Sequence, residues 1–158
     1  MIITEIAGNL ADLSPDDRSR LEVDRVFFDN ESRLKRVQRV TSDAGEEVAL
    51  RLGSEVRELH DGDVLRLDGD RAIVAAISPT DVLAIAPRSV REALVIAHTL
   101  GNRHLQAQFF DAGSEFGRDV MVVRYDHTVE HYLDHVGADY QRVEHVMPEA
   151  FRHAEHSH

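Results

Sequence analysis

Short apolar runs separated by turn sequences fill the first half of the chain. Runs of apolar residues, or alternation of apolar and polar residues, recur at 21–28, 37–40, 48–52, 64–67 and 71–77. Two of the intervening turns carry an Asp-Gly pair, at Asp61-Gly62 and Asp68-Gly69. This pair favours hairpins because Gly accepts a positive φ. The pattern predicts five or six short strands that form a small all-β domain, a sandwich or a barrel, over residues 1–77.

Strands and helices alternate in the second half. Apolar strand patterns lie at 82–86, 105–109, 120–123 and 143–147, with a helical pattern after the first and another after the third. The resulting order β-α-β-β-α-β is that of a ferredoxin-like domain, which we assign to residues 78–147. Beyond Pro148 the chain is polar and carries histidines, so residues 148–158 are expected to form a flexible tail. The predicted fold class is therefore α+β.

The first of the two predicted helices begins with a capping box. Ser89 is its N-cap, and Glu92 follows three residues later. Three apolar residues then recur at helical spacing, and a glycine stands where the helix should end in the left-handed αL conformation: Val90, Leu94, Ala97 and Gly101.

The second predicted helix begins at a different kind of cap, the carboxylate of Asp126, and ends at Gly137. Its buried face is expected to consist of Val129, Tyr132, Leu133 and Val136.

The net charge of the chain limits the classes of molecule that it is expected to bind. The 158 residues contain 29 Asp+Glu against 18 Lys+Arg, a formal net charge of −11. Such a chain repels phosphate backbones and anionic lipid surfaces, which argues against nucleic acid or a membrane as its main partner. Its apolar runs are far too short to span a bilayer, and its first residues lack a signal-peptide pattern, so we expect a cytoplasmic protein.

Histidine is abundant and cysteine is absent. The chain has 10 His and no Cys, which excludes disulfides and thiolate sites. Four of the histidines lie near the C-terminus: His145, His153, His156 and His158. Imidazoles without thiols favour Ni²⁺, Zn²⁺ or Cu²⁺.

The first candidate metal ligand is His104, in the sequence Gly101-Asn102-Arg103-His104 between the first helix and the next strand. We expect Gly and Asn to release the helix and His104 to open the strand. Alternation would then place its imidazole on the face opposite Leu105 and Ala107, away from the hydrophobic face. The alternative is a surface histidine in an ordinary turn.

The second candidate is the run from His127 to His131. These two histidines are four residues apart, so they share one helix face and can chelate one metal ion. With Glu130 they also fit the H-x-x-E-H pattern of a metallopeptidase, although a catalytic zinc needs a third protein ligand. A solvated polar helix face without metal is the other interpretation. The third candidate is the tail, in which His153, His156 and His158 could close on an ion that is held elsewhere.

Taken together, these features resemble the UreE-type urease accessory proteins, which are nickel metallochaperones. The resemblance rests on the all-β half followed by the ferredoxin-like half, and on Gly101-Asn102-Arg103-His104 after the helix. Tyr125-Asp126-His127 and the His-bearing C-terminus complete it, so that it covers nearly the whole chain.

The resemblance implies a homodimer formed through the C-terminal domain, in which His104 of each copy faces one metal ion near the two-fold axis. Tail histidines would complete the coordination. His127 falls where some members place a peripheral metal ligand. The companion position two residues on is Val129 here, and His131 is the candidate substitute.

The resemblance further implies that the N-terminal domain binds a peptide or partner. The partners would be the accessory GTPase UreG and the urease apoprotein assembly complex. The expected function is therefore delivery of Ni²⁺ during urease assembly, by a protein that is not an enzyme and in which Zn²⁺ or Cu²⁺ could substitute in vitro. Two alternatives stay open: a small zinc metallopeptidase that uses His127, Glu130 and His131, and a metal-independent interaction module.

Overall fold

A computed structural model describes residues 1–152, and the chain forms two compact units. The first unit comprises Met1–Pro79 together with Val146–Ala150, and the second comprises Thr80–His145 and the chain from Phe151. Within residues 1–152, no helix has both the length and the apolar character needed to cross a bilayer.

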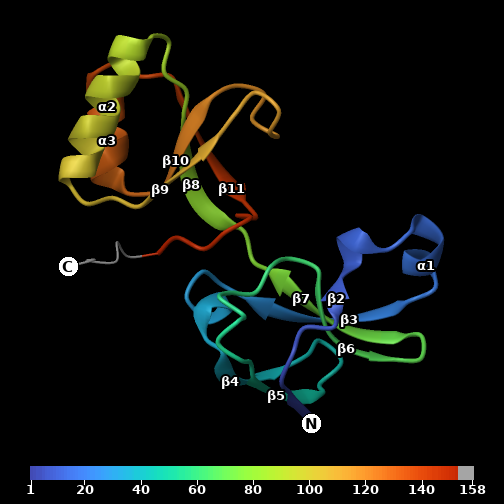
Figure 1. The fold of residues 1–158 in the computed structure, drawn as a ribbon. Coiled ribbons are helices and arrows are strands. Elements are labelled where there is room, and N and C mark those ends of the chain that lie inside the picture. Colours follow the sequence, from blue (N-terminus) through green and yellow to red (C-terminus); the bar gives the residue numbers. More distant parts are fainter. Residues whose placement is uncertain (153–158) are drawn as a thin grey trace. The chain divides into compact units, whose positions relative to one another are not determined.

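The first unit contains two sheets (Figure 1). A three-stranded sheet has the order β1-β5-β4, and a four-stranded sheet has the order β2-β6-β7-β3. The strands are β1 (Ile2–Ile3), β2 (Gly8–Asn9), β3 (Glu22–Phe28), β4 (Val37–Thr41), β5 (Glu47–Arg51), β6 (Asp63–Asp68) and β7 (Arg71–Ile77). Three short helical turns accompany them, η1 (Leu10–Asp12), α1 (Pro15–Ser19) and η2 (Ser32–Leu34).

Side chains from both sheets make the larger core of this unit. Val26 and Phe28 of β3 and Leu50 of β5 alternate with less buried neighbours and lie in the same cluster. A second, smaller cluster takes the alternate residues of β6 and β7, and it consists of Leu10, Val64, Ala72 and Val74. The predicted β-rich unit is confirmed, and of the two architectures left open, sandwich or barrel, its two sheets form a sandwich. The glycines of both predicted Asp-Gly turns have a positive φ, 86° at Gly62 and 60° at Gly69. The turn at Gly69 joins the hairpin β6–β7, whereas the one at Gly62 connects strands of different sheets.

The sequence analysis missed the smallest elements of this unit. The helix α1 has recognisable start signals, because the Ser14 hydroxyl accepts a hydrogen bond from the Asp17 N–H and Pro15 occupies the first turn. The strands β1 and β2 are two residues long, too short for any periodicity to show.

The second unit has the predicted ferredoxin-like topology. Its elements in order are β8 (Thr80–Ile85), α2 (Val90–Asn102), β9 (Ala107–Phe110), β10 (Val120–Arg124), α3 (His127–His135) and β11 (Tyr140–His145). The sheet order is β11-β8-β10-β9, and every neighbouring pair is antiparallel. The helices α2 and α3 lie side by side on one face of this sheet (Figure 1). Their buried residues pack with those of the central strands, in a core made of Leu83, Ile85, Ile96, Leu100, Met121, Val123, Val129 and Leu133.

Three strands of the second unit differ from the prediction by two residues or more. The predicted strand 82–86 is Thr80–Ile85. The predicted strand 105–109 is Ala107–Phe110, because residues before Ala107 belong to the turn that ends α2. The predicted strand 143–147 is Tyr140–His145. It lies at an edge of the sheet, and its polar residues do not show the apolar pattern of a central strand. His145 therefore ends β11 and is not part of the tail.

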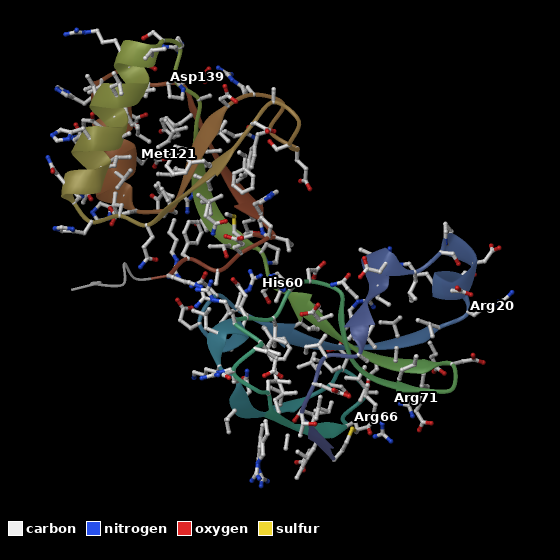
Figure 2. All side chains as sticks on the ribbon, viewed as in Figure 1. Arg20, His60, Arg66, Arg71, Met121 and Asp139 are labelled. Carbon is white, nitrogen blue, oxygen red and sulfur yellow. The ribbon has the colours of Figure 1, made fainter. Side chains whose placement is uncertain are left out.

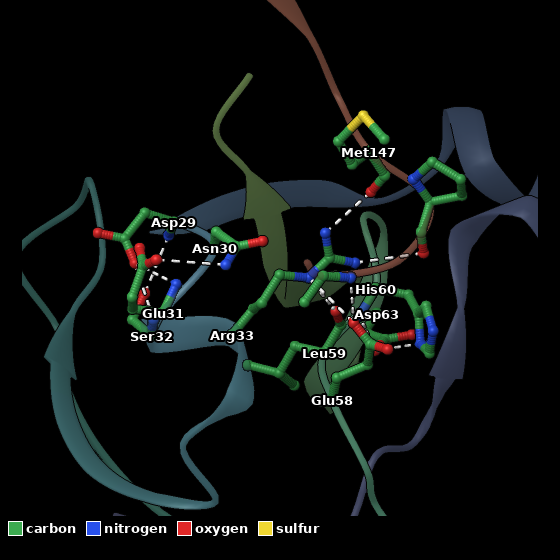
Figure 3. Close-up of polar contacts among 12 residues, drawn as sticks. Asp29, Asn30, Glu31, Ser32, Arg33, Glu58, Leu59, His60, Asp63 and Met147 are labelled. Atoms are coloured by element: carbon green, nitrogen blue, oxygen red, sulfur yellow. Dashed lines mark hydrogen bonds and ion pairs between the residues drawn. The ribbon is translucent and has the colours of Figure 1, made fainter. Parts of the chain in front are cut away.

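A buried arginine fixes the segment that follows β11 within the first unit. The guanidinium of Arg33 donates hydrogen bonds to the carbonyls of Leu59 (3.0 Å), Met147 (2.8 Å) and Pro148 (3.3 Å) (Figure 3). Its Nε lies 3.5 Å from a carboxylate oxygen of Glu58, and that oxygen accepts a 2.7 Å hydrogen bond from the Ala150 N–H. Neither side chain of this pair is exposed by more than a tenth.

Candidate metal site

His104 occupies a special backbone position at the end of α2. The helix is capped by Arg103, and the next two N–H groups turn back onto it: His104 N–H donates to the Gly101 carbonyl (2.9 Å) and Leu105 N–H to the Leu100 carbonyl (3.4 Å). This is the hydrogen-bond pattern of a Schellman motif, in which the residue after the cap adopts the left-handed conformation. That residue is His104, with φ 56°.

The expectation for Gly101 is wrong. Gly101 lies inside α2 and does not have a positive φ, because the helix continues through Asn102. Among residues 1–152, His104 is the single residue other than glycine with a positive φ. Glycine is favoured at this position since it has no Cβ to clash, and another residue there costs roughly 1–2 kcal/mol.

The corresponding turn after α3 shows the usual solution. There Gly137 has φ 66°, its N–H donates to the Asp134 carbonyl, and Ala138 N–H donates to the Leu133 carbonyl. The two helices therefore end in the same motif, with glycine in one and histidine in the other. Histidine thus stands at a position where the backbone alone would favour glycine, and such an outlier points to a use for its side chain.

The expected strand position of His104 is also wrong, since it precedes β9 and lies in the turn. Its side chain is exposed, as the sequence analysis expected.

A polar network ties this turn to the start of α3. The Arg103 guanidinium donates a hydrogen bond to the hydroxyl of Thr128. The Asp126 carboxylate caps α3 by accepting hydrogen bonds from the N–H groups of Thr128 (2.8 Å) and Val129 (3.3 Å). Hydrogen bonds from Thr128 come first among the causes that hold the pKa of Asp126 below its ordinary value, and the charge of Arg103 adds to them. The residues that flank Arg103 and Thr128 in sequence are His104 and His127.

The second candidate pair lies on α3. His127 is the first residue of the helix and His131 is one turn on, and both side chains are exposed. Because they are four residues apart on an α-helix, they share one face. Glu130, the acid of the predicted metallopeptidase pattern, accepts a 3.4 Å hydrogen bond from the hydroxyl of Tyr125.

The third candidate set, His153, His156 and His158, lies outside the described residues. Within residues 1–152, no group of three or more His, Asp or Glu side chains is arranged to hold a metal ion. The structure thus presents exposed imidazoles singly or in pairs.

Four histidines remain. His135 is exposed and ends α3, one turn beyond His131. The other three lie outside the candidate sets. The backbone N–H of His60 donates a 2.7 Å hydrogen bond to the carboxylate of Asp63. His98 lies 3.2 Å from the amide of Asn102 on the exposed side of α2. His145 is nearly buried against the ring of Phe116, with ring centroids 5.0 Å apart.

Both halves of the chain match models of known families. Residues 3–78 match the N-terminal domain of the UreE urease accessory protein, and residues 80–158 match its C-terminal domain. The chain belongs to the UreE family.

Full-length relatives agree with this assignment. The chain is 56% identical to the urease accessory protein UreE of Corynebacterium urealyticum (strain ATCC 43042 / DSM 7109) over 158 residues, all of both chains. It is 53% identical to that of Arthrobacter sp. (strain FB24) and 52% identical to that of Paenarthrobacter aurescens (strain TC1), again over the whole of each chain.

One contact beside the candidate ligand His104 was not predicted from the sequence. The hydrogen bond from Arg103 to Thr128 joins residues 25 positions apart in the sequence. No local sequence pattern predicts a contact over that separation. By contrast, the cap at Asp126 was predicted because Asp before an apolar helical pattern is a strong local signal.

Proposed function

We propose that this chain is a nickel-binding metallochaperone that delivers Ni²⁺ during assembly of the urease active site. The observation that carries the proposal is an exposed His104 at a helix end where glycine is favoured, in a full-length UreE-family chain. Imidazole nitrogens suit nickel, and a carrier needs ligands that hold the ion without enclosing it.

The proposed metal ligands come from two copies of the chain. His104 of each copy supplies one nitrogen, and tail histidines complete the coordination from among His153, His156 and His158. His127 and His131 supply a second, peripheral site. Because the divalent affinity series places copper above nickel, Zn²⁺ or Cu²⁺ would also bind in vitro, and supply in the cell would decide the cargo.

Exposed apolar surface on the second unit supports the proposed homodimer. On α2, Val90 is 78% exposed and Leu94 is 66% exposed, and Phe109 of the edge strand β9 is 73% exposed. Phe109 also lines a pocket of about 410 Å³ together with residues of α2 and β10. Exposed apolar side chains of this kind favour an interface. A two-fold symmetric contact at this surface would double the number of histidine ligands near the axis, and the chain itself would not need to be larger.

The proposed partners are those of the urease maturation system. Nickel would be exchanged with the accessory GTPase UreG and passed to the urease apoprotein complex in the cytoplasm. The names of the relatives describe urease accessory proteins, which supports a role in assembly and not in catalysis. The metallopeptidase interpretation would require zinc-dependent peptide cleavage that is lost in Glu130→Gln.

Calorimetric nickel titration of two matched variants tests the proposal. His104→Ala should weaken the tight site by about 100-fold or more, beyond what the loss of an outer-shell partner usually costs. His98→Ala removes another exposed histidine of the same unit and should leave the tight site unchanged. Unaltered tight binding in His104→Ala would refute the proposed site.

A further inference from the structure

The strand β4 is a free edge of the three-stranded sheet in the first unit. In the order β1-β5-β4 its one neighbour is β5, paired antiparallel with Val37 opposite Arg51 and Thr41 opposite Glu47. An edge strand presents unpaired N–H and C=O groups that can accept a further strand.

The register identifies which residues present those groups. Leu52 N–H donates to the Arg36 carbonyl, and Ser42 N–H donates to the Glu46 carbonyl. Hydrogen-bonded pairs alternate along an antiparallel ladder, so the even-numbered residues of β4 face β5. The N–H and C=O groups of Val37, Arg39 and Thr41 therefore point away from the sheet. Within the part of the chain that is described, no hydrogen bond from these three N–H groups is found.

Unpaired cations accompany this edge. Arg36, Arg39 and Arg51 are exposed, and none forms an ion pair with a described residue. Elsewhere in the unit, Arg66 and Arg71 point together and share the carboxylate of Glu46, at 3.5 and 3.9 Å (Figure 2). Basic residues without acidic partners are notable in a chain whose net charge is −11.

Apolar surface lies among these cations. Val37 is 71% exposed, and it shares a face of the sheet with Arg39 and, across the ladder, Arg51. The edge thus offers backbone hydrogen bonds, an apolar contact and positive charge along one short strand.

We propose that β4 binds an extended acidic segment of a partner protein by strand addition. Main-chain hydrogen bonds to Val37, Arg39 and Thr41 supply affinity, and the arginines select for acidic side chains. Positive charge on an edge repels a second copy of the same edge, which opposes self-association. The same charge attracts an acidic strand and steers its approach.

Peptide binding to the metal-free, full-length protein tests the charge preference. The probe is a fluorescent peptide that alternates Glu and Val, and the comparison peptide alternates Lys and Val at the same length. Anisotropy should show binding of the Glu peptide that weakens with added salt, and little binding of the Lys peptide. Equal binding of both peptides, or preferential binding of a single-stranded oligonucleotide, would overturn the proposal. Because nickel is absent, the result is independent of the proposed metal site.

Charge reversal locates the surface. Arg36→Glu with Arg39→Glu should weaken binding of the Glu peptide about tenfold or more, since two attractive contacts become repulsive. Arg20→Glu with Arg91→Glu makes the same change in net charge at exposed positions elsewhere and should change binding little. Equal loss in both double variants would show attraction to the whole molecule and would overturn the assignment to β4.

Backbone changes separate strand addition from charge attraction alone. Val37→Pro removes one outward N–H and leaves the ladder to β5 intact, so the thermal midpoint should be kept while peptide binding falls about tenfold. A Glu peptide methylated on alternate backbone nitrogens should bind comparably weakly to the unaltered protein, a result that does not depend on folding of the variant. Full binding of the methylated peptide in both possible registers would overturn strand addition.

Discussion

At the scale of single residues, His104 stands at a position where the backbone favours glycine but the proposed metal site needs an imidazole. The Schellman turn after α2 requires a left-handed residue, and the matching turn after α3 satisfies that requirement with Gly137. His104 meets it with a β-carbon, which is destabilising. The proposed metal ligand is therefore held by backbone hydrogen bonds in a defined turn, at a small cost in folding free energy.

Substituting His104 by Gly should stabilise the fold while removing the imidazole. We expect the free energy of unfolding to rise by about 0.5–1 kcal/mol, because the relief of left-handed strain exceeds the added entropy of glycine in the unfolded chain. His104→Ala keeps the strain and should change stability less. Urea unfolding of both variants without metal measures the difference.

The reverse change at the other helix provides the control. No atom lies within 4 Å of a β-carbon built on Gly137, so Gly137→Ala meets only the backbone penalty. It should lower the free energy of unfolding by about 1 kcal/mol. A His104→Gly variant less stable than His104→Ala would contradict this account of the turn.

At the scale of elements, the sequence identifies caps and topology better than it identifies what covers each face. Ser89 and Asp126 cap α2 and α3 as predicted, and the strand–helix order gave the ferredoxin-like sheet. The helical spacing of Val90 and Leu94 is real, but both are exposed, and Ile96 and Leu100 are the buried residues of α2. The periodicity of apolar residues identifies an apolar stripe on a helix, but it does not show whether other residues of the same chain bury that stripe.

The helix-end residue was mislocated for a related reason. Gly101 is a strong local stop signal, but tertiary packing of Leu100 and Leu105 on the core places the left-handed residue three positions further, at His104. Long-range contacts such as Arg103 to Thr128 leave no periodic trace at all.

The two helix caps should respond differently to acid. The pKa of Asp126 is held below its ordinary value of 3.8, chiefly by hydrogen bonds from Thr128. A carboxylate whose pKa falls on folding stabilises the fold above its unfolded pKa, and this contribution is lost as the pH drops through the folded value. Asp126→Ala should therefore cost about 1 kcal/mol at about pH 7 and clearly less near pH 3.

The cap of α2 is the control for that experiment. The Ser89 hydroxyl accepts a 3.0 Å hydrogen bond from the Glu92 N–H and carries no charge. Ser89→Ala should cost a similar amount, with little change between the two pH values. Urea unfolding at both pH values measures each loss, and an equal pH response in the two variants would exclude the charged cap as its source.

At the scale of the whole molecule, the buried Arg33–Glu58 pair returns the chain after β11 to the first unit. Arg33→Met would remove the guanidinium that lies 3.5 Å from the buried Glu58 carboxylate, and with it the donors to the Met147 and Pro148 carbonyls. Breaking a buried pair from one side costs about 3–5 kcal/mol, which urea unfolding would detect.

Two further variants show whether the loss of stability comes from the buried ion pair. Arg142 pairs with Asp81 in a half-exposed arrangement, so Arg142→Met should cost far less than Arg33→Met. Adding Glu58→Leu to Arg33→Met removes the other member of the buried pair and should recover part of the lost stability. A double variant that loses more stability than the two single variants together would contradict coupling between Arg33 and Glu58 as the cause.

The proposed assembly places a further demand on α2, because one exposed His104 per chain is a weak ligand set and two-fold pairing doubles it. Leu94→Glu puts a charge in the middle of the exposed apolar stripe but outside the core of its own unit. It should convert a dimer into a folded monomer in mass measurements, and nickel affinity should fall although His104 is intact.

Leu67→Glu is the control. It alters another exposed leucine, 55% exposed on β6, and should change neither property. A Leu94→Glu protein that stays dimeric would place the interface elsewhere. One that becomes monomeric yet binds nickel as tightly as before would show that the ion does not need both copies.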